Sequence, residues 1–240
     1  MNRRFWLLAI CATAALVACS ESQQARGIRA TSGFLGEDYP LLKEGEGEEA
    51  LMVYRREGAD WAAYKQLWLA PVSIWAAEES SFADFSPADR QQLADRFYAL
   101  VHEELEKDYK MVSAPGAGVL DVQIALTDAE RSNSTLDTVS TVLPQALVVS
   151  SLTGLVTGKP AFVGEAQAEV KITDGGSGDL LGAAVDRRVG GKSIAGSTSS
   201  WSDVESALQY WAQRLRYRLC TERSGADCVK PGTEQPAQTG

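Results

Sequence analysis

The sequence predicts an α/β protein of the α+β type, a two-layer sandwich. We expect a mostly antiparallel sheet of four to six strands with two main helices on one face. Three observations support this fold. Two segments repeat apolar residues at helical spacing, several segments alternate apolar and polar residues as strands do, and a glycine-rich turn joins two of these. Hydrophobic residues make up 45% of the 240-residue chain, enough for the core of one large domain.

Each predicted helix has a recognisable start and an apolar stripe. Ser86 can cap the first helix and Pro87 suits its first position; the helix should end near Asp108. Residues 202–205, Ser-Asp-Val-Glu, form a capping box for the second helix. The stripes are Leu93, Phe97, Leu100, Val101 and Leu105 in the first helix, and Val204, Leu208, Trp211, Leu215 and Leu219 in the second.

The strands have two kinds of pattern. Residues 67–75 are nearly all apolar, which is typical of a strand buried on both faces, and Pro71 predicts a bulge or an open edge there. Residues 120–126 and 166–172 alternate instead, which predicts strands with one buried face. The turn at residues 174–179 makes the second of these the first half of a hairpin.

The first residues resemble a secretory signal. Arg3 and Arg4 precede an apolar run that is shorter than the roughly 20 residues a membrane span needs. The run leads into Leu-Val-Ala and Cys19, the pattern at which lipoprotein processing acylates the cysteine and cuts before it. The alternative is an ordinary signal cut nearby, with Cys19 incidental. We expect a lipid anchor on Cys19.

This interpretation divides the chain into four parts. They are a lipoprotein signal peptide at 1–18, the lipidated cysteine with a flexible tether at 19–32, a single α/β domain at 33–222, and a C-terminal tail at 223–240. Ser20 follows the anchor, where an aspartate would act as an inner-membrane retention signal. We therefore expect an outer-membrane lipoprotein of the cell envelope that faces the periplasm.

Charge and cysteine use agree with export. The net charge of −9 disfavours nucleic acid as a partner and disfavours electrostatic adhesion to a membrane, so the membrane contact should be the anchor. Cys220 and Cys228 predict a disulfide in an oxidising compartment. A catalytic or metal-binding cysteine pair is the alternative, but the spacing is not Cys-x-x-Cys.

Residues 136–158 are the most apolar part of the mature chain. Polar residues interrupt them, so no clean run of 18 apolar residues exists to cross a membrane. The first interpretation is a buried, partly helical segment that covers one sheet face. The alternative is a surface for lipid or a partner protein, to which Leu147, Val148 and Leu152 would contribute.

Catalytic patterns are scarce. His102 is the only histidine and projects from the flank of the first helix, and neither a Gly-x-Ser-x-Gly motif nor a metal-ligand cluster occurs. We therefore expect no cofactor and no metal. The most concentrated polar cluster is Asp186, Arg187 and Arg188, which is either a water-exposed ion pair at a strand end or a binding edge. Glu165 and Glu169 share a strand face, which alone is weak support for glycosidase chemistry.

Several stretches together resemble a known family. The first are residues 32–36 (Ser-Gly-Phe-Leu-Gly), 38–39 (Asp-Tyr) and 64–65 (Tyr-Lys), followed by Pro71, Val72 and Trp75. The later ones are residues 164–166 (Gly-Glu-Ala), Glu169, Asp174, Gly178 and 183–188 (Ala-Ala-Val-Asp-Arg-Arg). Over roughly residues 30 to 222 the chain resembles the bacterial lipoproteins catalogued as domain of unknown function 3313. The resemblance implies an envelope lipoprotein and carries over no catalytic residue.

These observations favour a non-catalytic binding or assembly module of the cell envelope, with an envelope protein as its partner. The alternative is a protein that binds lipid or a small ligand through residues 136–158. An enzyme of unknown class is the third hypothesis.

Overall fold

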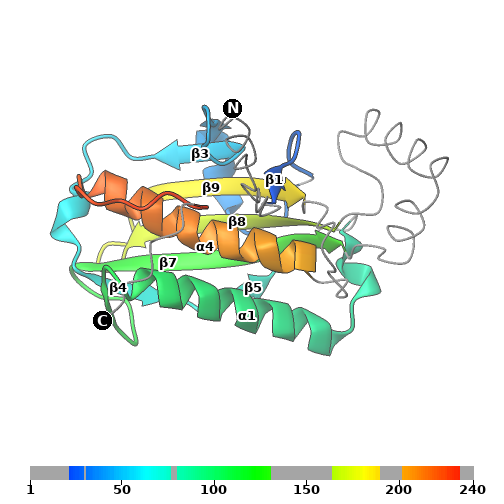
Figure 1. The fold of residues 1–240 in the computed structure, drawn as a ribbon. Helices are drawn as coiled ribbons and strands as arrows, with labels where there is room; N and C mark the ends of the chain where they lie inside the picture. The colour runs from blue at the N-terminus through cyan, green and yellow to red at the C-terminus, as the bar shows by residue number, and fades with distance from the viewer. Residues whose placement is uncertain (1–21, 30, 77–79, 131–163, 190–201, 233–240) are drawn as a thin grey trace, which may run out of the picture.

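The computed structural model describes residues 22–29, 31–76, 80–130, 164–189 and 202–232, without the side chains of 83, 84, 202 and 203. Its centre is one twisted sheet, with the helices α1 (Pro87–Leu105) and α4 (Ser202–Glu222) side by side on one face (Figure 1). Three short 3-10 helices are η1 (Gly36–Leu41), η2 (Trp61–Ala63) and η3 (Ser81–Asp84). No helix of the described residues is long and apolar enough to span a membrane.

Three long strands form the middle of the sheet. They are β7 (Val119–Glu130), β8 (Glu165–Asp174) and β9 (Leu180–Val189), each antiparallel to the next. The turn between β8 and β9 lies where the sequence predicts the hairpin. The full order is β2-β3-β9-β8-β7-β4-β6, with β1 paired to β9 and β5 paired to β7.

Within the described residues the sheet has nine strands, so the expected four to six was too few. The additions are short: β1 (Gln23–Gln24), β2 (Lys43–Glu44), β5 (Ser73–Ile74) and β6 (Lys110–Met111) have two residues each, and β3 (Met52–Arg55) and β4 (Gln66–Leu69) have four. Two-residue strands are too short to show an alternation, which is why the sequence does not predict their number. The predicted strand at 67–75 splits around Pro71 into β4 and β5, both parallel to β7.

The main core lies between the helices and the sheet. The Ser86 hydroxyl accepts a hydrogen bond from the Asp89 N–H and starts α1 at Pro87, as predicted. Phe97 of α1 packs against Trp211 of α4, with ring centroids 5.9 Å apart. Both predicted stripes face this core, although Leu215 is only partly buried.

Residues 22–29 and 31–42 are here called the N-terminal strap, which begins at the edge of β9 and then covers the other face of the sheet. Leu35 of the strap is 1% exposed and packs on Ala183 and Val185 of β9. At its start, β1 pairs with β9 in the register Gln23 to Val189 and Gln24 to Arg188. The expectation of a flexible tether up to residue 32 is therefore wrong for the described residues from 22 onward. They bury apolar and polar side chains that are too dispersed to form a local pattern.

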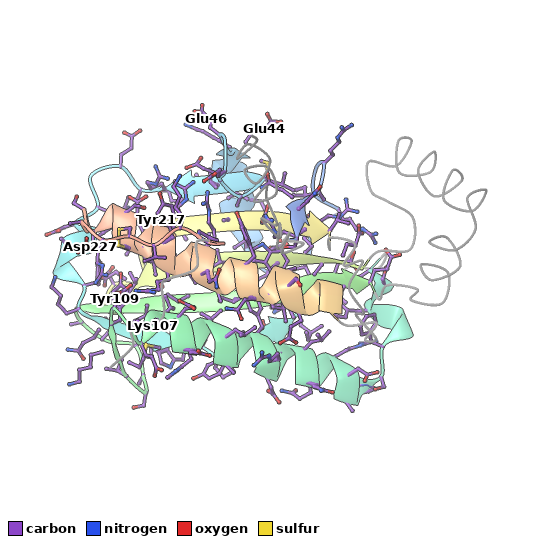
Figure 2. All side chains as sticks on the ribbon, viewed as in Figure 1. Glu44, Glu46, Lys107, Tyr109, Tyr217 and Asp227 are labelled. Carbon is purple, nitrogen blue, oxygen red and sulfur yellow. A yellow bond between two sulfur atoms is a disulfide. The ribbon has the colours of Figure 1, made fainter. Side chains whose placement is uncertain are left out.

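The residues after α4 also pack on the domain. The Arg223 guanidinium lies 4.3 Å from the centroid of the Tyr109 ring. Burial raises the pKa of Tyr109, which is labelled in Figure 2, to about 12. The predicted disulfide joins Cys220 and Cys228, whose Cα atoms are 5.6 Å apart. Residues 223–232 are thus part of the domain, and the expected tail boundary at 223 is too early.

Candidate functional site

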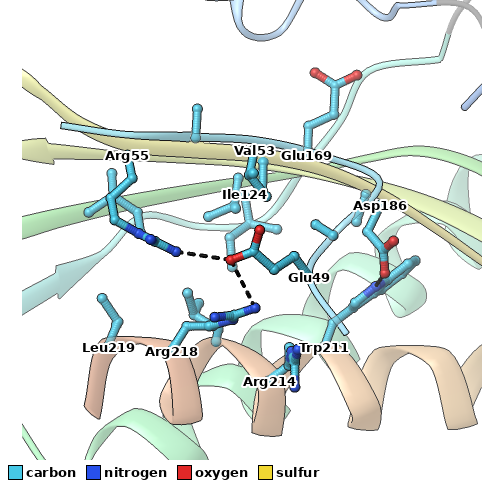
Figure 3. A pocket seen from close by; sticks show the side chains of 18 of the residues that line it. Glu49, Val53, Arg55, Ile124, Glu169, Asp186, Trp211, Arg214, Arg218 and Leu219 are labelled. Atoms are coloured by element: carbon cyan, nitrogen blue, oxygen red, sulfur yellow. Dashed lines mark hydrogen bonds and ion pairs between the residues drawn. The ribbon is translucent and has the colours of Figure 1, made fainter. Parts of the chain in front are cut away.

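A cavity of about 170 Å³ lies between α4 and the strands β3, β8 and β9 (Figure 3). Its apolar lining comes from all of these elements. It includes Val53, Trp61, Phe97, Ile124, Val170, Ile172, Trp211, Leu215 and Leu219. The cavity therefore continues the main core outward, on the side of α4 away from α1.

Small residues on the sheet leave this space open. Ala168 of β8 and both Gly182 and Ala184 of β9 line the cavity. At Gly182 a Cβ atom would lie 3.4 Å from the Trp61 ring, so the absence of a side chain lets that ring approach the strand closely. Because these positions carry a single methyl group or no side chain, they leave space between the sheet and α4.

Charged side chains line the cavity where the turn after β2 approaches α4. Glu49 forms ion pairs with Arg55 and Arg218, each with an N–O distance of 3.1 Å (Figure 3). Arg55 also pairs with Glu222 at 2.7 Å. Burial alone would raise the pKa of Glu49, but the Glu46 N–H and the two arginine charges lower it overall. The site thus combines an apolar floor with a connected set of ion pairs.

Asp186 lies at one end of the cavity and is 8% exposed. Its carboxylate accepts hydrogen bonds from Trp211 Nε1 (2.8 Å), Gln24 Nε2 (2.8 Å) and the Leu51 N–H (3.3 Å). These donors come from α4, β1 and the segment before β3. Asp186 therefore ties three elements together on the helix side of β9.

The predicted binding edge at Asp186, Arg187 and Arg188 is not an edge. β9 is an interior strand with β8 on one side and β1 and β3 on the other, and Asp186 and Arg188 are buried. Arg187 points to the opposite face, where Nη2 lies 2.7 Å from both carboxylate oxygens of Glu165. The alternative interpretation, a water-exposed ion pair at a strand end, is also wrong. The short strands β1 and β3, which are distant in the sequence, pair with this part of β9.

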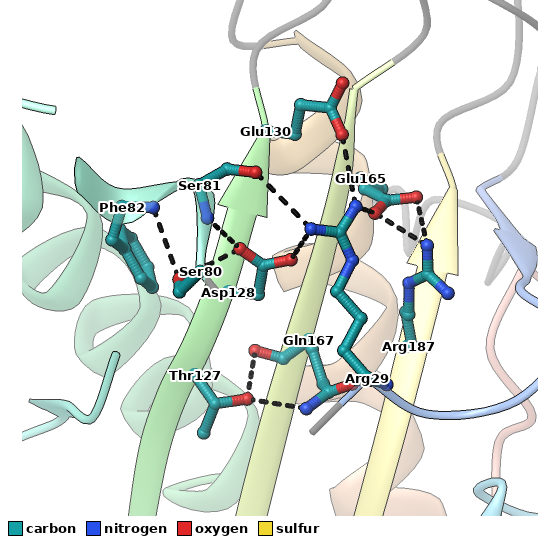
Figure 4. A network of polar contacts seen from close by, with 10 residues as sticks. All are labelled: Arg29, Ser80, Ser81, Phe82, Thr127, Asp128, Glu130, Glu165, Gln167 and Arg187. Atoms are coloured by element: carbon teal, nitrogen blue, oxygen red, sulfur yellow. Dashed lines mark hydrogen bonds and ion pairs between the residues drawn. The ribbon is translucent and has the colours of Figure 1, made fainter. Parts of the chain in front are cut away.

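A second polar cluster lies on the strap face (Figure 4). The Arg29 guanidinium of the strap contacts Asp128 (2.9 Å), Glu130 (3.3 Å) and Glu165. Asp128 also accepts hydrogen bonds from the Ser80 hydroxyl and the Ser81 N–H. We call these residues, together with Arg187, Thr127 and Gln167, the Arg29 cluster. Because the carboxylates face arginines and N–H donors, the cluster holds the strap to the sheet.

Glu165 and Glu169, which the sequence places on one strand face, have different partners. Each is 1% exposed. Glu169 accepts a hydrogen bond of 2.7 Å from the Tyr39 hydroxyl, and burial raises the pKa of Glu169 despite this bond. Burial likewise raises the pKa of Tyr39. The two carboxylates are engaged by the strap and do not line the cavity together.

The remaining predicted residues are quickly placed. His102 lies on α1 with its side chain 37% exposed, and Nδ1 is 3.4 Å from Glu106. Within the described ranges, no group of three or more histidine, cysteine or acidic residues could hold a metal ion. Cys19 and the segment 136–158, with Leu147, Val148 and Leu152, lie outside the described residues. The cavity was missed because its lining comes from distant segments, although Gly182 and Ala184 within a strand were a signal.

The chain belongs to a family described as a protein of unknown function (DUF3313), whose model matches residues 30–215. A search of curated proteins finds no match. Among solved structures, the chain is similar to PelC from Paraburkholderia phytofirmans, crystallised as a dodecamer (11% identity, 71% of this chain and 95% of that one, TM-score 0.36). It is also similar to a Xanthomonas campestris protein of the DUF330 family (11%, 71% and 92%, TM-score 0.41).

Proposed function

We propose that this DUF3313 protein is a lipid-anchored, non-catalytic binding module of the cell envelope. In this proposal Cys19 carries the anchor, and the domain faces the periplasm from the outer membrane. The cavity beneath α4 receives an apolar side chain of a partner protein. The observation that carries the proposal is the cavity itself, with its apolar floor and its ion pairs.

The size of the cavity favours a side chain over a whole small molecule. Sites for small molecules usually measure about 300–1,000 Å³, whereas this cavity measures about 170 Å³. An apolar cavity of about 150 Å³ is known to take a single benzene ring. One aromatic or branched aliphatic side chain fits this volume, and such anchors contribute much of the binding energy at protein interfaces.

The carboxylates support a binding role over a catalytic one. Glu165 is held by two arginines, Glu169 by Tyr39, and Asp186 by three N–H donors. Each therefore has a structural function that accounts for its burial. A general acid or base needs a proton it can exchange with a substrate, and none of these three groups faces the open part of the cavity with a free oxygen pair.

The proposed role of the cavity can be tested with a substitution that fills it. Ala184→Leu places a larger apolar side chain in the space, and Ala99→Leu makes the same change on the exposed face of α1 as a control. Toluene is the probe for a ring-sized group. At ten times its Kd it should raise the free energy of unfolding by about 1.4 kcal/mol in the native protein and in Ala99→Leu. It should have no effect on Ala184→Leu, and equal stabilisation of all three would contradict the proposal.

The partner is tested in living cells. A photo-crosslinking amino acid at position 48, which lines the cavity, should yield an adduct with an envelope protein. The adduct should be lost in Ala184→Leu and kept in Ala99→Leu. Octanoate tests the alternative of lipid binding. If octanoate competes with toluene for the cavity and no protein adduct depends on position 184, the proposed binding of a partner protein is wrong and the cavity binds lipid.

A further inference from the structure

The strap is tied to the domain at Ser22, its first described residue. Ser22 is 3% exposed, and its hydroxyl accepts a hydrogen bond of 2.9 Å from Arg188 Nε. The same hydroxyl donates to the Ser206 carbonyl of α4 at 3.5 Å. Arg188 in turn stacks on the Tyr210 ring, 3.4 Å from its centroid. Ser22 is therefore fixed to both β9 and α4.

Ser22 stands three residues after Cys19 in the sequence. A chain extends at most about 3.6 Å per residue, so the anchored cysteine can lie no more than roughly 11 Å from Ser22. A flexible tether up to residue 32 would have allowed a much larger separation. The domain is therefore held close to the lipid-anchored cysteine.

The position of Ser22 shows which end of the sheet lies near Cys19. β1 pairs with the last residues of β9, and Val189 of β9 lies opposite Glu165, the first residue of β8. The turn at 175–179 lies at the other end of the same strands. Glu57 also lies at that end, because the preceding residue, Arg56, donates a backbone hydrogen bond to Leu181 at the start of β9. The 10 residues of β8 separate the two ends by about 30 Å at 3.3 Å per residue.

We propose that the end of the sheet where β1 meets β9 rests on the phospholipid surface of the membrane, held there by the three-residue connection between Cys19 and Ser22. This inference rests on the proposed lipid anchor. It adds an orientation: the strap end, with the exposed residues Gln23 and Arg26, faces the lipid headgroups. The hairpin turn at 175–179 then points away from the membrane, toward the periplasm.

The experiment uses the full acylated protein in phosphatidylethanolamine and phosphatidylglycerol vesicles that contain a lipid with a nitroxide headgroup. With Cys19 acylated and Cys220 bonded to Cys228, an introduced cysteine is the only thiol of the mature chain. Fluorophores go on Gln23→Cys or Arg26→Cys at the near end, and on Glu57→Cys or Ser177→Cys at the far end. All four positions are exposed.

We expect the nitroxide to quench the near-end labels several-fold more than the far-end labels. A twelve-residue Gly-Ser insertion between Ser20 and Glu21 adds about 20 Å of average reach, so it should bring near-end quenching down toward the far-end value. Equal or reversed quenching in acylated protein overturns the orientation, and unchanged quenching after the insertion overturns the short connection as its cause. Mass spectrometry that finds Cys19 without acyl chains in the membrane fraction overturns the anchor itself, which is a separate failure.

Discussion

The two faces of the sheet are covered in different ways. On one face, α1 and α4 bury apolar side chains such as Phe97, Leu208 and Ile124 in one continuous core. On the other face, the strap buries Glu165, Gln167 and Glu169 of β8, each of which is 1% exposed. Apolar burial on the helix face is favourable in itself, whereas burial of polar groups on the strap face costs free energy unless each group finds a partner.

The comparison explains how a polar strand face can be interior. Arg29, Tyr39 and the backbone N–H of Arg29 supply partners to Glu165, Glu169 and Gln167, with Gln167 at 2.7 Å from that N–H. The helix face should therefore depend on volume and shape, and the strap face on matched partners. Three substitutions separate these two expectations.

The largest effect is expected on the helix face. Phe97→Ala removes a ring that is 2% exposed and packed on Trp211, so it should lower the free energy of unfolding by about 3–5 kcal/mol. Urea denaturation followed by circular dichroism measures the change. Gln92→Ala on the exposed side of α1 is the control, with a change within about 0.5 kcal/mol. Equal losses for the two variants would show that the helix face is not the main core.

A smaller but still large effect is expected at the Arg29 cluster. Glu165→Gln keeps the volume but leaves Arg187 and Arg29 without their shared carboxylate. Breaking a buried pair costs about 3–5 kcal/mol, and Arg29 is 30% exposed and keeps Asp128, so we expect about 2–4 kcal/mol. Glu130→Gln, with a side chain that is 39% exposed, should cost under about 1 kcal/mol in the same denaturation assay. If Glu130→Gln proves the more costly change, the strap is not held through Glu165.

The smallest effect is a dependence on pH. The pKa of Glu169 is raised by burial above its ordinary value of 4.5, so the folded protein binds this proton more readily than the unfolded chain does. Stability from this group is therefore present at low pH and declines as the pH rises through the raised pKa. Glu169→Gln cannot titrate and should lack that decline.

The measurement is the free energy of unfolding of both proteins between pH 4 and pH 7. As the pH rises, the free energy of unfolding of Glu169→Gln should increase relative to that of the native protein. Tyr39→Phe serves as a companion variant because it removes the hydroxyl that stabilises the charged carboxylate. If the native protein instead gains stability relative to Glu169→Gln as the pH rises, the hydrogen bonds to Glu169 lower its pKa by more than burial raises it.

Parts of the structure with a local pattern were predicted well. The helix stripes, the cap at Ser86, the break at Pro71 and the 174–179 turn each follow from a few neighbouring residues. The alternation along β8 was also predicted, but alternation does not tell what lies against the polar face of the strand. The local pattern does not show that Tyr39, 130 residues away, covers Glu169. The cavity could not be predicted for the same reason, since its lining comes from seven separate segments.

The sequence by itself determined the helices, the central hairpin, the family and the Cys220–Cys228 bridge, because spacing, turn chemistry and cysteine count act over short distances. Only the tertiary structure decided which polar residues are interior, where a cavity remains and where the strap is fixed. Gln24 pairs with Arg188 across 164 positions of sequence. Such a contact depends on what the rest of the fold leaves uncovered, and for that reason the strap from Ser22 onward is part of the domain.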